Sequence, residues 1–237
     1  PQLEVEEVWN VERSLNIAGR ANVEFVAPTG LNVDYYRAKF PGVSIRRVDA
    51  HYLQSVGSYN ELMLSPDFYQ CYDQYEFVLV VQTDAVLLRD VGTLDLTGVD
   101  YVGAPWTAGL KYRKIASRLS VWMPQSGHRA ASPLHIVARY GGRTAFVGNG
   151  GLSIRRVVAF IDMCQELRGL VPHYLKSNLN EDVVFSTVGR DRGLRVGSVD
   201  FAGQVFREDL SVQQATLMDL YGVHAPARIT GSAGTLC

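Results

Sequence analysis

The sequence lacks the features of several protein classes. Its 237 residues include only three cysteines, and no CxxC spacing, which argues against a disulfide scaffold and favours a reducing compartment. No apolar run reaches the roughly 18 residues that a membrane-spanning helix needs, and neither an N-x-[ST] sequon nor a signal-peptide pattern is present. We therefore expect a cytoplasmic protein, with residues 1–237 forming a single domain that has its own core.

Acidic residues are missing from one long segment. Residues 101–161 contain no Asp or Glu but hold nine basic residues, which leaves 14 basic against all 24 acidic residues in the rest of the chain. The overall formal charge is only −1, so no general attraction to nucleic acid is expected. The segment instead indicates a locally cationic surface, suited to an acceptor molecule that carries phosphate.

Helix and strand patterns alternate along the chain. Helices are expected from Val5 to Leu15, within 33–40, over 59–72, from Ile154 to Leu167 with Ser153 as the N-cap, and from Glu181. Strands are expected at Val23–Ala27, Val43–Val48, Phe77–Val81, Val99–Gly103, Ala145–Val147 and Arg195–Val199. Such alternation predicts an α/β fold with a mixed, mostly parallel central sheet flanked by helices.

The stretch Tyr75–Asp90 contains the first candidate site residue. Five consecutive apolar residues, Phe77–Val81, predict a strand buried on both faces, and Gln82, Thr83 and Asp84 follow it directly. Ligands of open α/β sheets bind at the carboxyl ends of strands. Asp84 is therefore either a functional carboxylate or a residue that caps a turn.

Glycines 148, 150 and 151 and Asn149 form a second motif, Gly148-Asn149-Gly150-Gly151. We expect it to follow a short strand and to open a helix, whose backbone amides suit an anionic or hydroxyl-rich ligand. The alternative is a tight turn with glycines at positive φ. The motif is not the dinucleotide-binding fingerprint, because Ser153 stands where the last glycine is required.

Three further polar residues have two interpretations each. Glu181 and Asp182 begin a predicted helix, where carboxylates either cap the helix or act as a general base toward a hydroxyl group. His224 lies in a late loop, and it is either a packed surface residue or a metal ligand.

The segment Lys111–Met123 places apolar residues on one face of a predicted helix and basic residues on the remainder. The apolar set is Tyr112, Ile115, Leu119 and Trp122, and the basic set is Lys111, Arg113, Lys114 and Arg118. This pattern is typical of peripheral contact with an anionic membrane or of a phosphate-bearing substrate site. It is equally typical of a solvated helix packed on the body of the protein.

Several blocks, taken together and in order, resemble a known family. The first block is Ser58-Tyr59-Asn60 with Leu62-Met63-Leu64-Ser65 and Phe68-Tyr69. The later blocks are YEFVLVVQTDAVLL, Asp100-Tyr101-Val102-Gly103-Ala104-Pro105-Trp106, GNGGLSIRR, Asn180-Glu181-Asp182-Val183-Val184-Phe185, Phe201-Ala202 to Phe206-Arg207-Glu208, and Gly222-Val223-His224. They resemble an uncharacterised glycosyltransferase-like family with QxD, DYVGAPW, GNGGLSLR and EDVFF blocks. Members are similar to nucleotide-sugar transferases of the GT-A type.

The resemblance implies a metal-assisted glycosyltransferase with one GT-A-like domain. Asp84 and His224 would bind Mn²⁺ or Mg²⁺. Gln82, Thr83, Trp106 and the residues of the motif, Gly148, Asn149, Gly150 and Gly151, would bind donor or acceptor, and Glu181 or Asp182 would face the acceptor hydroxyl. The implied partners are a nucleotide-sugar donor and a glycan or lipid-linked acceptor, as in polysaccharide biosynthesis.

Two features depart from the family pattern. Gln82 stands where many such transferases carry the first acid of Asp-x-Asp, so the motif has one carboxylate fewer for a metal. The chain also opens at Pro1-Gln2-Leu3-Glu4, after the point where the first nucleotide-binding strand is expected. Two alternatives therefore stay open: a non-catalytic sugar- or nucleotide-binding domain with a degenerate metal motif, and a phosphotransferase or nucleotidyltransferase using the same Asp–metal chemistry.

Overall fold

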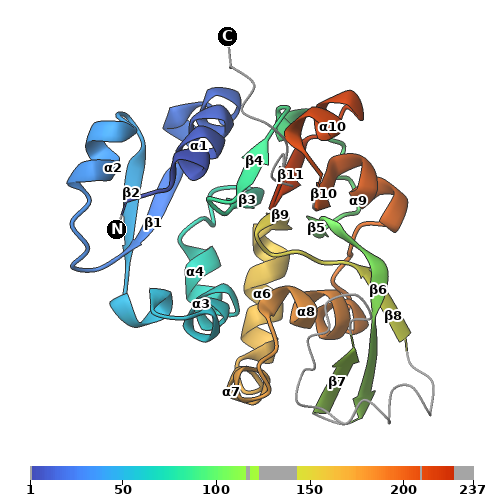
Figure 1. The fold of residues 1–237 in the computed structure, drawn as a ribbon. Coiled ribbons are helices and arrows are strands. Elements are labelled where there is room, and N and C mark those ends of the chain that lie inside the picture. Colours follow the sequence, from blue (N-terminus) through green and yellow to red (C-terminus); the bar gives the residue numbers. More distant parts are fainter. Residues whose placement is uncertain (1, 116–117, 123–142, 209, 227–237) are drawn as a thin grey trace.

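Helices and short strands alternate in a mixed α/β arrangement, as the sequence predicts (Figure 1). The computed structural model describes residues 2–115, 118–122, 143–208 and 210–226. The helices are α1 (Val5–Ala18), α2 (Asp34–Lys39), α3 (Val56–Met63), α4 (Pro66–Gln70), α6 (Val157–Leu167), α7 (Val171–Lys176), α8 (Glu181–Val184), α9 (Val199–Val205) and α10 (Val212–Leu217). The strands are β1 (Glu24–Pro28), β2 (Ser44–Val48), β3 (Phe77–Val81), β4 (Ala85–Leu87), β5 (Tyr101–Gly103), β6 (Pro105–Ile115), β7 (Arg118–Trp122), β8 (Arg143–Val147), β9 (Leu152–Arg156), β10 (Phe206–Glu208) and β11 (Gly222–His224).

The strands form small sheets rather than one large sheet. Their orders are β1-β2, β3-β9-β5, β10-β11-β4 and β7-β6-β8. Within the described residues, the paired strands β1-β2 and β10-β11 are parallel, and the other pairs are antiparallel. A mostly parallel central sheet is therefore not confirmed. The cause is β9, which returns between β3 and β5 and runs against both, so that β3 and β5 point the same way.

Strand β3 differs from its expected environment. All five of its residues are half-buried rather than buried on both faces. Its hydrogen-bonded neighbour is β9, and β3 lies at the edge of that sheet. An apolar run thus predicted the strand correctly, but it did not predict how many neighbours would cover it.

Two predicted elements differ from the structure near β9 and β5, and a third, Lys111–Met123, differs in type. The helix expected from Ile154 begins only at Val157, because Leu152–Arg156 is β9. The strand expected at Arg195–Val199 is reduced to one isolated bridge from Val196 to Tyr101.

The segment Lys111–Met123 is not a helix. Its described part lies in two antiparallel strands, β6 and β7, with Lys111 opposite Trp122. Met123 itself lies outside the described residues. Short amphipathic segments fit helical and strand periods about equally well, which explains the error.

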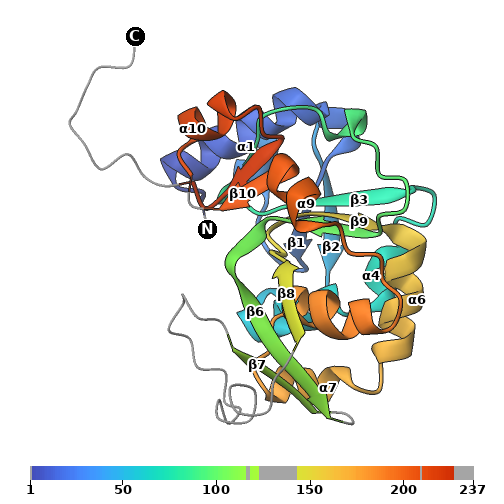
Figure 2. The same ribbon diagram turned by 90° about the vertical axis from the view of Figure 1, so that its right-hand side faces the viewer.

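The largest apolar cluster surrounds α6. Phe160 of α6 lies 5.1 Å from Tyr69 of α4 and 4.6 Å from Phe185, measured between ring centroids. Figure 2 shows α4 and α6 side by side. The guanidinium of Arg155 is fully buried in this cluster and lies 5.6 Å from the Phe160 ring centroid. A buried cation is costly unless it is paired, so its partners decide the local structure.

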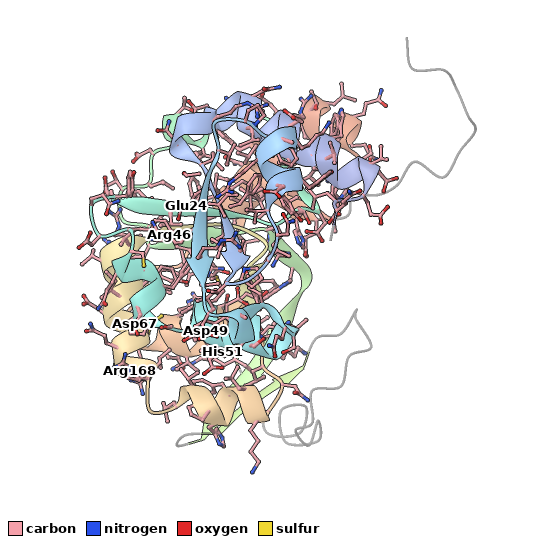
Figure 3. The ribbon with its side chains drawn as sticks, turned by 90° about the vertical axis from the view of Figure 1, so that its left-hand side faces the viewer. Glu24, Arg46, Asp49, His51, Asp67 and Arg168 are labelled. Atoms are coloured by element: carbon pink, nitrogen blue, oxygen red, sulfur yellow. The ribbon has the colours of Figure 1, made fainter. Side chains whose placement is uncertain are left out.

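Exposed and partly buried ion pairs occupy a different face. Figure 3 shows Glu24 with Arg46, Asp49 with His51, and Asp67 with Arg168 along the side that includes β1, β2 and α4. Surface pairs of this kind contribute little to stability. In the described part of the chain, no helix combines the length and the hydropathy that a bilayer crossing requires.

Helix α1 holds the segment on both sides of Asp84. Glu7 accepts a hydrogen bond from the Thr83 hydroxyl, Asn10 donates to the Thr83 carbonyl (3.2 Å), and Ser14 accepts from the Leu87 amide (3.0 Å). Residues 7, 10 and 14 share one helical face, because they are three and four positions apart. The helix therefore fixes the chain that carries Asp84 without contacting its carboxylate.

Replacing Ser14 with alanine tests this attachment. Ser14→Ala leaves the buried Leu87 amide without its acceptor, so we expect a loss of about 1–3 kcal/mol in the free energy of unfolding. The measurement is chemical denaturation. Ser177→Ala is the control, because the Ser177 hydroxyl bonds to His173 within its own helix (3.0 Å). Equal stabilities of the two variants would contradict the proposed attachment.

Candidate functional site

The segment from Gly148 to Gly151 connects β8 and β9, which belong to different sheets, and does not open a helix. The expected binding of an anion at a helix N-terminus is therefore wrong here. Ser153 lies inside β9, fully buried, and its hydroxyl donates to the Gly150 carbonyl (3.1 Å). The alternative prediction, a tight turn with glycines at positive φ, is correct only in part. The residue with positive φ (54°) is Asn149, not one of these glycines.

The glycines of this loop are required for space. A Cβ at Gly148 would lie 2.0 Å from the Trp106 ring, and a Cβ at Gly150 would lie 2.0 Å from Glu181 Oε1. At Gly151 a Cβ would lie 2.4 Å both from Gln82 Oε1 and from His224 Nε2. The loop thus touches four of the residues that the sequence singled out, and these come from distant parts of the chain.

His224 is the centre of a polar cluster on one side of the loop. Its Nε2 lies 3.5 Å from Asp84 Oδ1, and its Nδ1 lies 3.4 Å from Glu208 Oε1. Asn149 donates from Nδ2 to Glu208 and lies 2.9 Å from His224 Nδ1. Strands β10, β11 and β4 are adjacent in one sheet, which brings Glu208, His224 and the residue preceding Ala85 together (Figure 1).

The charges of this cluster favour a protonated histidine. Burial lowers the pKa of His224, but hydrogen bonds to Asp84 and Glu208 outweigh burial and raise it to about 9. The same bond to His224 lowers the pKa of Asp84, against its partial burial. The imidazolium is therefore held between two carboxylates, and the cluster carries one net negative charge.

His224 and Asp84 could hold a divalent cation, but the described side chains offer too few ligands to complete its coordination. His224 Nε2 is buried and makes only a long contact, 3.5 Å, with Asp84, whose side chain is 56% exposed. Glu208 on Nδ1 would orient the ring, as carboxylates do behind metal-bound histidines. No group of three or more His, Cys, Asp or Glu side chains suited to a metal occurs among the described residues. Such an ion would need further oxygens from a bound ligand, which is typical of Mg²⁺ sites.

A second polar cluster lies on the other side of the loop. Glu181 is buried and forms an ion pair with Arg155 (3.0 Å), which also donates to the Gly150 carbonyl (3.1 Å) and the Tyr69 hydroxyl (2.7 Å). Asp182 Oδ2 accepts from the Gly150 amide (3.3 Å). Asp182 contacts Gly150, and His224 lies against the next residue, Gly151. The two polar clusters therefore meet at consecutive residues of the loop.

Asp182 is the more accessible carboxylate of the pair. Burial, with repulsion from Glu181 as a smaller cause, raises the pKa of Asp182 from 3.8 to about 7. Glu181 is instead committed to Arg155 and to the Asn60 side chain, whose Oδ1 accepts from its amide (3.3 Å). The geometry therefore makes Asp182 the candidate base and makes Glu181 a residue that holds α8 in place.

The two remaining candidates differ in orientation. The backbone N–H of Gln82 donates to the Gly151 carbonyl (2.7 Å), and the Gln82 side chain lies against Gly151. Thr83 bonds through both its hydroxyl and its carbonyl to α1, as described above. Its side chain is thus engaged by Glu7 in this structure.

Sequence reasoning assigned no role to two residues of the site. Glu208 belongs to a block that was noticed, but neither its spacing nor its type indicated a histidine partner. Arg155 lies in β9, Leu152-Ser153-Ile154-Arg155-Arg156, whose sequence is not apolar and gave no sign that the arginine is buried. The structure shows this burial, and a buried arginine requires a counter-charge.

Comparison with known families assigns the chain to a family but adds no activity. The family model DUF5672, described as a protein of unknown function, matches residues 42–218, most of the chain. The chain therefore belongs to the DUF5672 family. The matched region includes every candidate residue of the site except His224. A search of curated proteins finds no match.

Gly151→Ala tests the close approach at the loop. The added Cβ must displace Gln82 and His224, and overpacking of this kind costs about 1–3 kcal/mol. Gly169→Ala is the matched control, because a Cβ there would meet no atom within 4 Å. We expect a lower denaturation midpoint and shifted His224 imidazole NMR signals for Gly151→Ala alone. Identical behaviour of the two variants would contradict the packing.

The raised pKa of Asp182 predicts a pH-dependent stability. A carboxyl with a higher pKa in the folded state stabilises fully below its unfolded pKa, and this contribution is lost as pH rises through the folded value. For Asp182 the loss falls between about pH 4 and about pH 7.

Asp182→Asn should remove this dependence. Its stability relative to the unaltered protein should rise by up to about 4 kcal/mol from pH 4 to pH 8, by denaturant titration. Asp73→Asn, at an exposed position outside the site, is the control. A stability difference that stays constant with pH would show that Asp182 does not titrate in this range.

Proposed function

We propose that this chain is a glycosyltransferase, which moves a sugar from a nucleotide-diphosphate sugar to a hydroxyl group of a glycan or glycolipid. The observation that carries the proposal is the position of the Gly150–Gly151 loop. It has Asp84 and His224 on one side and Asp182 on the other. A diphosphate-binding centre and a base that face the same short loop are what a sugar transfer between two bound substrates requires.

A divalent metal, Mn²⁺ or Mg²⁺, belongs to this proposal. Asp84 and His224 would hold it, with Glu208 and Asn149 orienting the imidazole from behind. Such an ion neutralises charge on a departing diphosphate. A GT-A-like fold is part of the same proposal, although the sheet beside the site, β3-β9-β5, is antiparallel throughout.

Asp182 supplies the proton-transfer chemistry in an inverting reaction. It takes the proton of the acceptor hydroxyl while the acceptor oxygen forms a bond to the anomeric carbon and the bond to the diphosphate oxygen breaks. A base is most effective when its pKa lies near the working pH, and the pKa of Asp182 is about 7. In a retaining reaction Asp182 would instead orient the substrate. Gln82 lies against Gly151 and Trp106 against Gly148, and in this proposal both contribute to binding the donor or acceptor.

The cationic segment supports an acceptor that carries phosphate. Residues 101–161 contain nine basic and no acidic residues. Arg143, Arg155 and Arg156 are paired with acids from other parts of the chain. The support therefore comes from the basic residues of β6 and β7, which are Lys111, Arg113, Lys114 and Arg118. A phosphorylated or lipid-linked glycan has the complementary charge, and peripheral contact with a membrane surface stays within the proposal.

A non-catalytic sugar- or nucleotide-binding domain is the second candidate. The observation that favours it is Gln82, an uncharged residue in the first position of the acidic motif, together with a His224 already held between two carboxylates. Such a domain would bind its ligand without metal and would not cleave it.

Calorimetric titration separates the two candidates. For the transferase, we expect Mn²⁺ to strengthen nucleotide-diphosphate binding, Asp84→Ala to abolish this enhancement, and Glu208→Gln to weaken it about 10–100-fold. Asp73→Ala, at an exposed position away from the loop, is the control.

The same samples report the reaction. Slow donor hydrolysis, or transfer that adds a hexose mass to the acceptor, supports the transferase. Binding that ignores Mn²⁺, with no donor cleavage, supports the non-catalytic domain. A product that gains phosphate or nucleotide would instead show a phospho- or nucleotidyltransferase.

A further inference from the structure

Tyr59 of α3 lies at the loop and was not among the candidate residues. Its helix begins with a capping box between Ser55 and Ser58. The next residue, Asn60, is buried and bonds both to the Glu181 amide (3.3 Å) and to the Asn180 side chain (3.1 Å). Tyr59 is therefore held at a fixed position against the N-terminus of α8.

The Tyr59 hydroxyl is buried and has no well-formed hydrogen-bond partner among the described residues. The groups that influence it are Glu181, Arg155, Gln82 and Asp182, so it lies among the polar groups of the site. Its burial raises the pKa of Tyr59 to about 12, and the phenol is neutral. Buried polar atoms are normally paired, and an unpaired one at a candidate site points to an absent ligand.

Gln82 links this hydroxyl to the other side of the loop. Its side chain is near Tyr59, and its Oε1 would be 2.4 Å from a Cβ at Gly151. His224 Nε2 is equally close to that Cβ position, and its contact with Asp84 is long, at 3.5 Å. The Tyr59 hydroxyl and the His224 ring thus lie near Gln82 and the bare Cα of Gly151.

We propose that the Tyr59 hydroxyl and the Gln82 amide form a subsite that binds a hydroxyl group of the ligand, beside Gly151. Gln82 is partly exposed, so movement of its side chain opens Tyr59 to the ligand. The inference rests on the proposed function, because it takes the ligand to be a nucleotide-sugar.

The chemistry of the subsite selects an alcohol. A phenol and an amide together offer donors and acceptors without charge, which matches a hydroxyl group that both donates and accepts. The carboxylates of Glu181 and Asp182 influence the same phenol and disfavour a phosphate there. The hydroxyl belongs either to the ribose or to the transferred sugar.

The first measurement is thermal unfolding of the protein without ligand. Tyr59→Phe removes a hydroxyl that has no partner to lose, so we expect an unchanged or higher midpoint. Tyr174→Phe is the matched control, because the Tyr174 hydroxyl of α7 is also buried without a partner. A midpoint several degrees lower for Tyr59→Phe than for Tyr174→Phe would overturn the proposal, since the hydroxyl would then have a structural partner.

The second measurement is calorimetric binding in the presence of Mn²⁺, with the pairs UDP and UDP-glucose, GDP and GDP-mannose, and ADP and ADP-glucose. For the pair that binds the unaltered protein, we expect Tyr59→Phe to weaken binding about tenfold and Tyr174→Phe to leave it unchanged. A loss with both members of the pair assigns the hydroxyl to the ribose, and a loss with the sugar nucleotide alone assigns it to the sugar.

The two ways of failing are distinct. If the unaltered protein binds and Tyr59→Phe binds equally well, the subsite is refuted and the proposed function stands. If the unaltered protein binds none of the six nucleotides, both the proposed function and the subsite are refuted.

Discussion

The site depends on the buried ion pair between Arg155 and Glu181. Arg155 is fully buried among Tyr101, Phe160 and Phe185, where a lone cation would be very unfavourable. Its guanidinium is satisfied by Glu181, by the Gly150 carbonyl and by the Tyr69 hydroxyl. The apolar core, the loop and the first residue of α8 are therefore tied together at one group. Any shift of α8 relative to β9 would leave that group unpaired.

This single attachment also explains why two consecutive acids behave differently. Glu181 faces inward, and its charge is offset by Arg155. Asp182 is bonded by the Gly150 and Val183 amides, while Arg155 is the last of the influences on its pKa and burial is the first. One arginine thus compensates one carboxylate well and its neighbour poorly. A carboxyl that ionises near neutral pH follows from this imbalance without any special contact to Asp182.

Much of the fold could be predicted, and the errors share a cause. The helix at Val5 with its end at Gly19, the strands near Val23 and Val43 and the helix at Glu181 were correct, because periodicity and capping are local signals. The errors at Ile154 and Lys111 concern residues whose state depends on pairing with distant strands. Leu152–Arg156 is a strand because β3 and β5 lie on either side of it, which no local pattern encodes.

For the site, the sequence indicated which residues would gather but not the reason. The loop glycines were expected to bend the chain or bind an anion, whereas they leave room for Trp106, Glu181, Gln82 and His224. Glu208 and Tyr59 belong to blocks that were noticed, but no role could be predicted for them. Their contacts arise from the adjacency of β10 with β11 and of α3 with α8. The ordered blocks thus indicated which residues belong to the site. How these residues are arranged depends on tertiary contacts that the sequence does not reveal.

The neutral side chain of Gln82 is consistent with the charges around it. The cluster of Asp84, Glu208 and a protonated His224 already has one net negative charge, and Asp182 adds another when it ionises. A carboxylate at position 82 would lie beside Gly151 and Tyr59, between the Asp84–Glu208 cluster and Asp182. The cations near it, Arg155 and His224, are already paired with other carboxylates. An amide keeps the hydrogen-bonding oxygen at this position and avoids that repulsion. A neutral residue at position 82 thus avoids repulsion from Asp182, which lies on the other side of the loop.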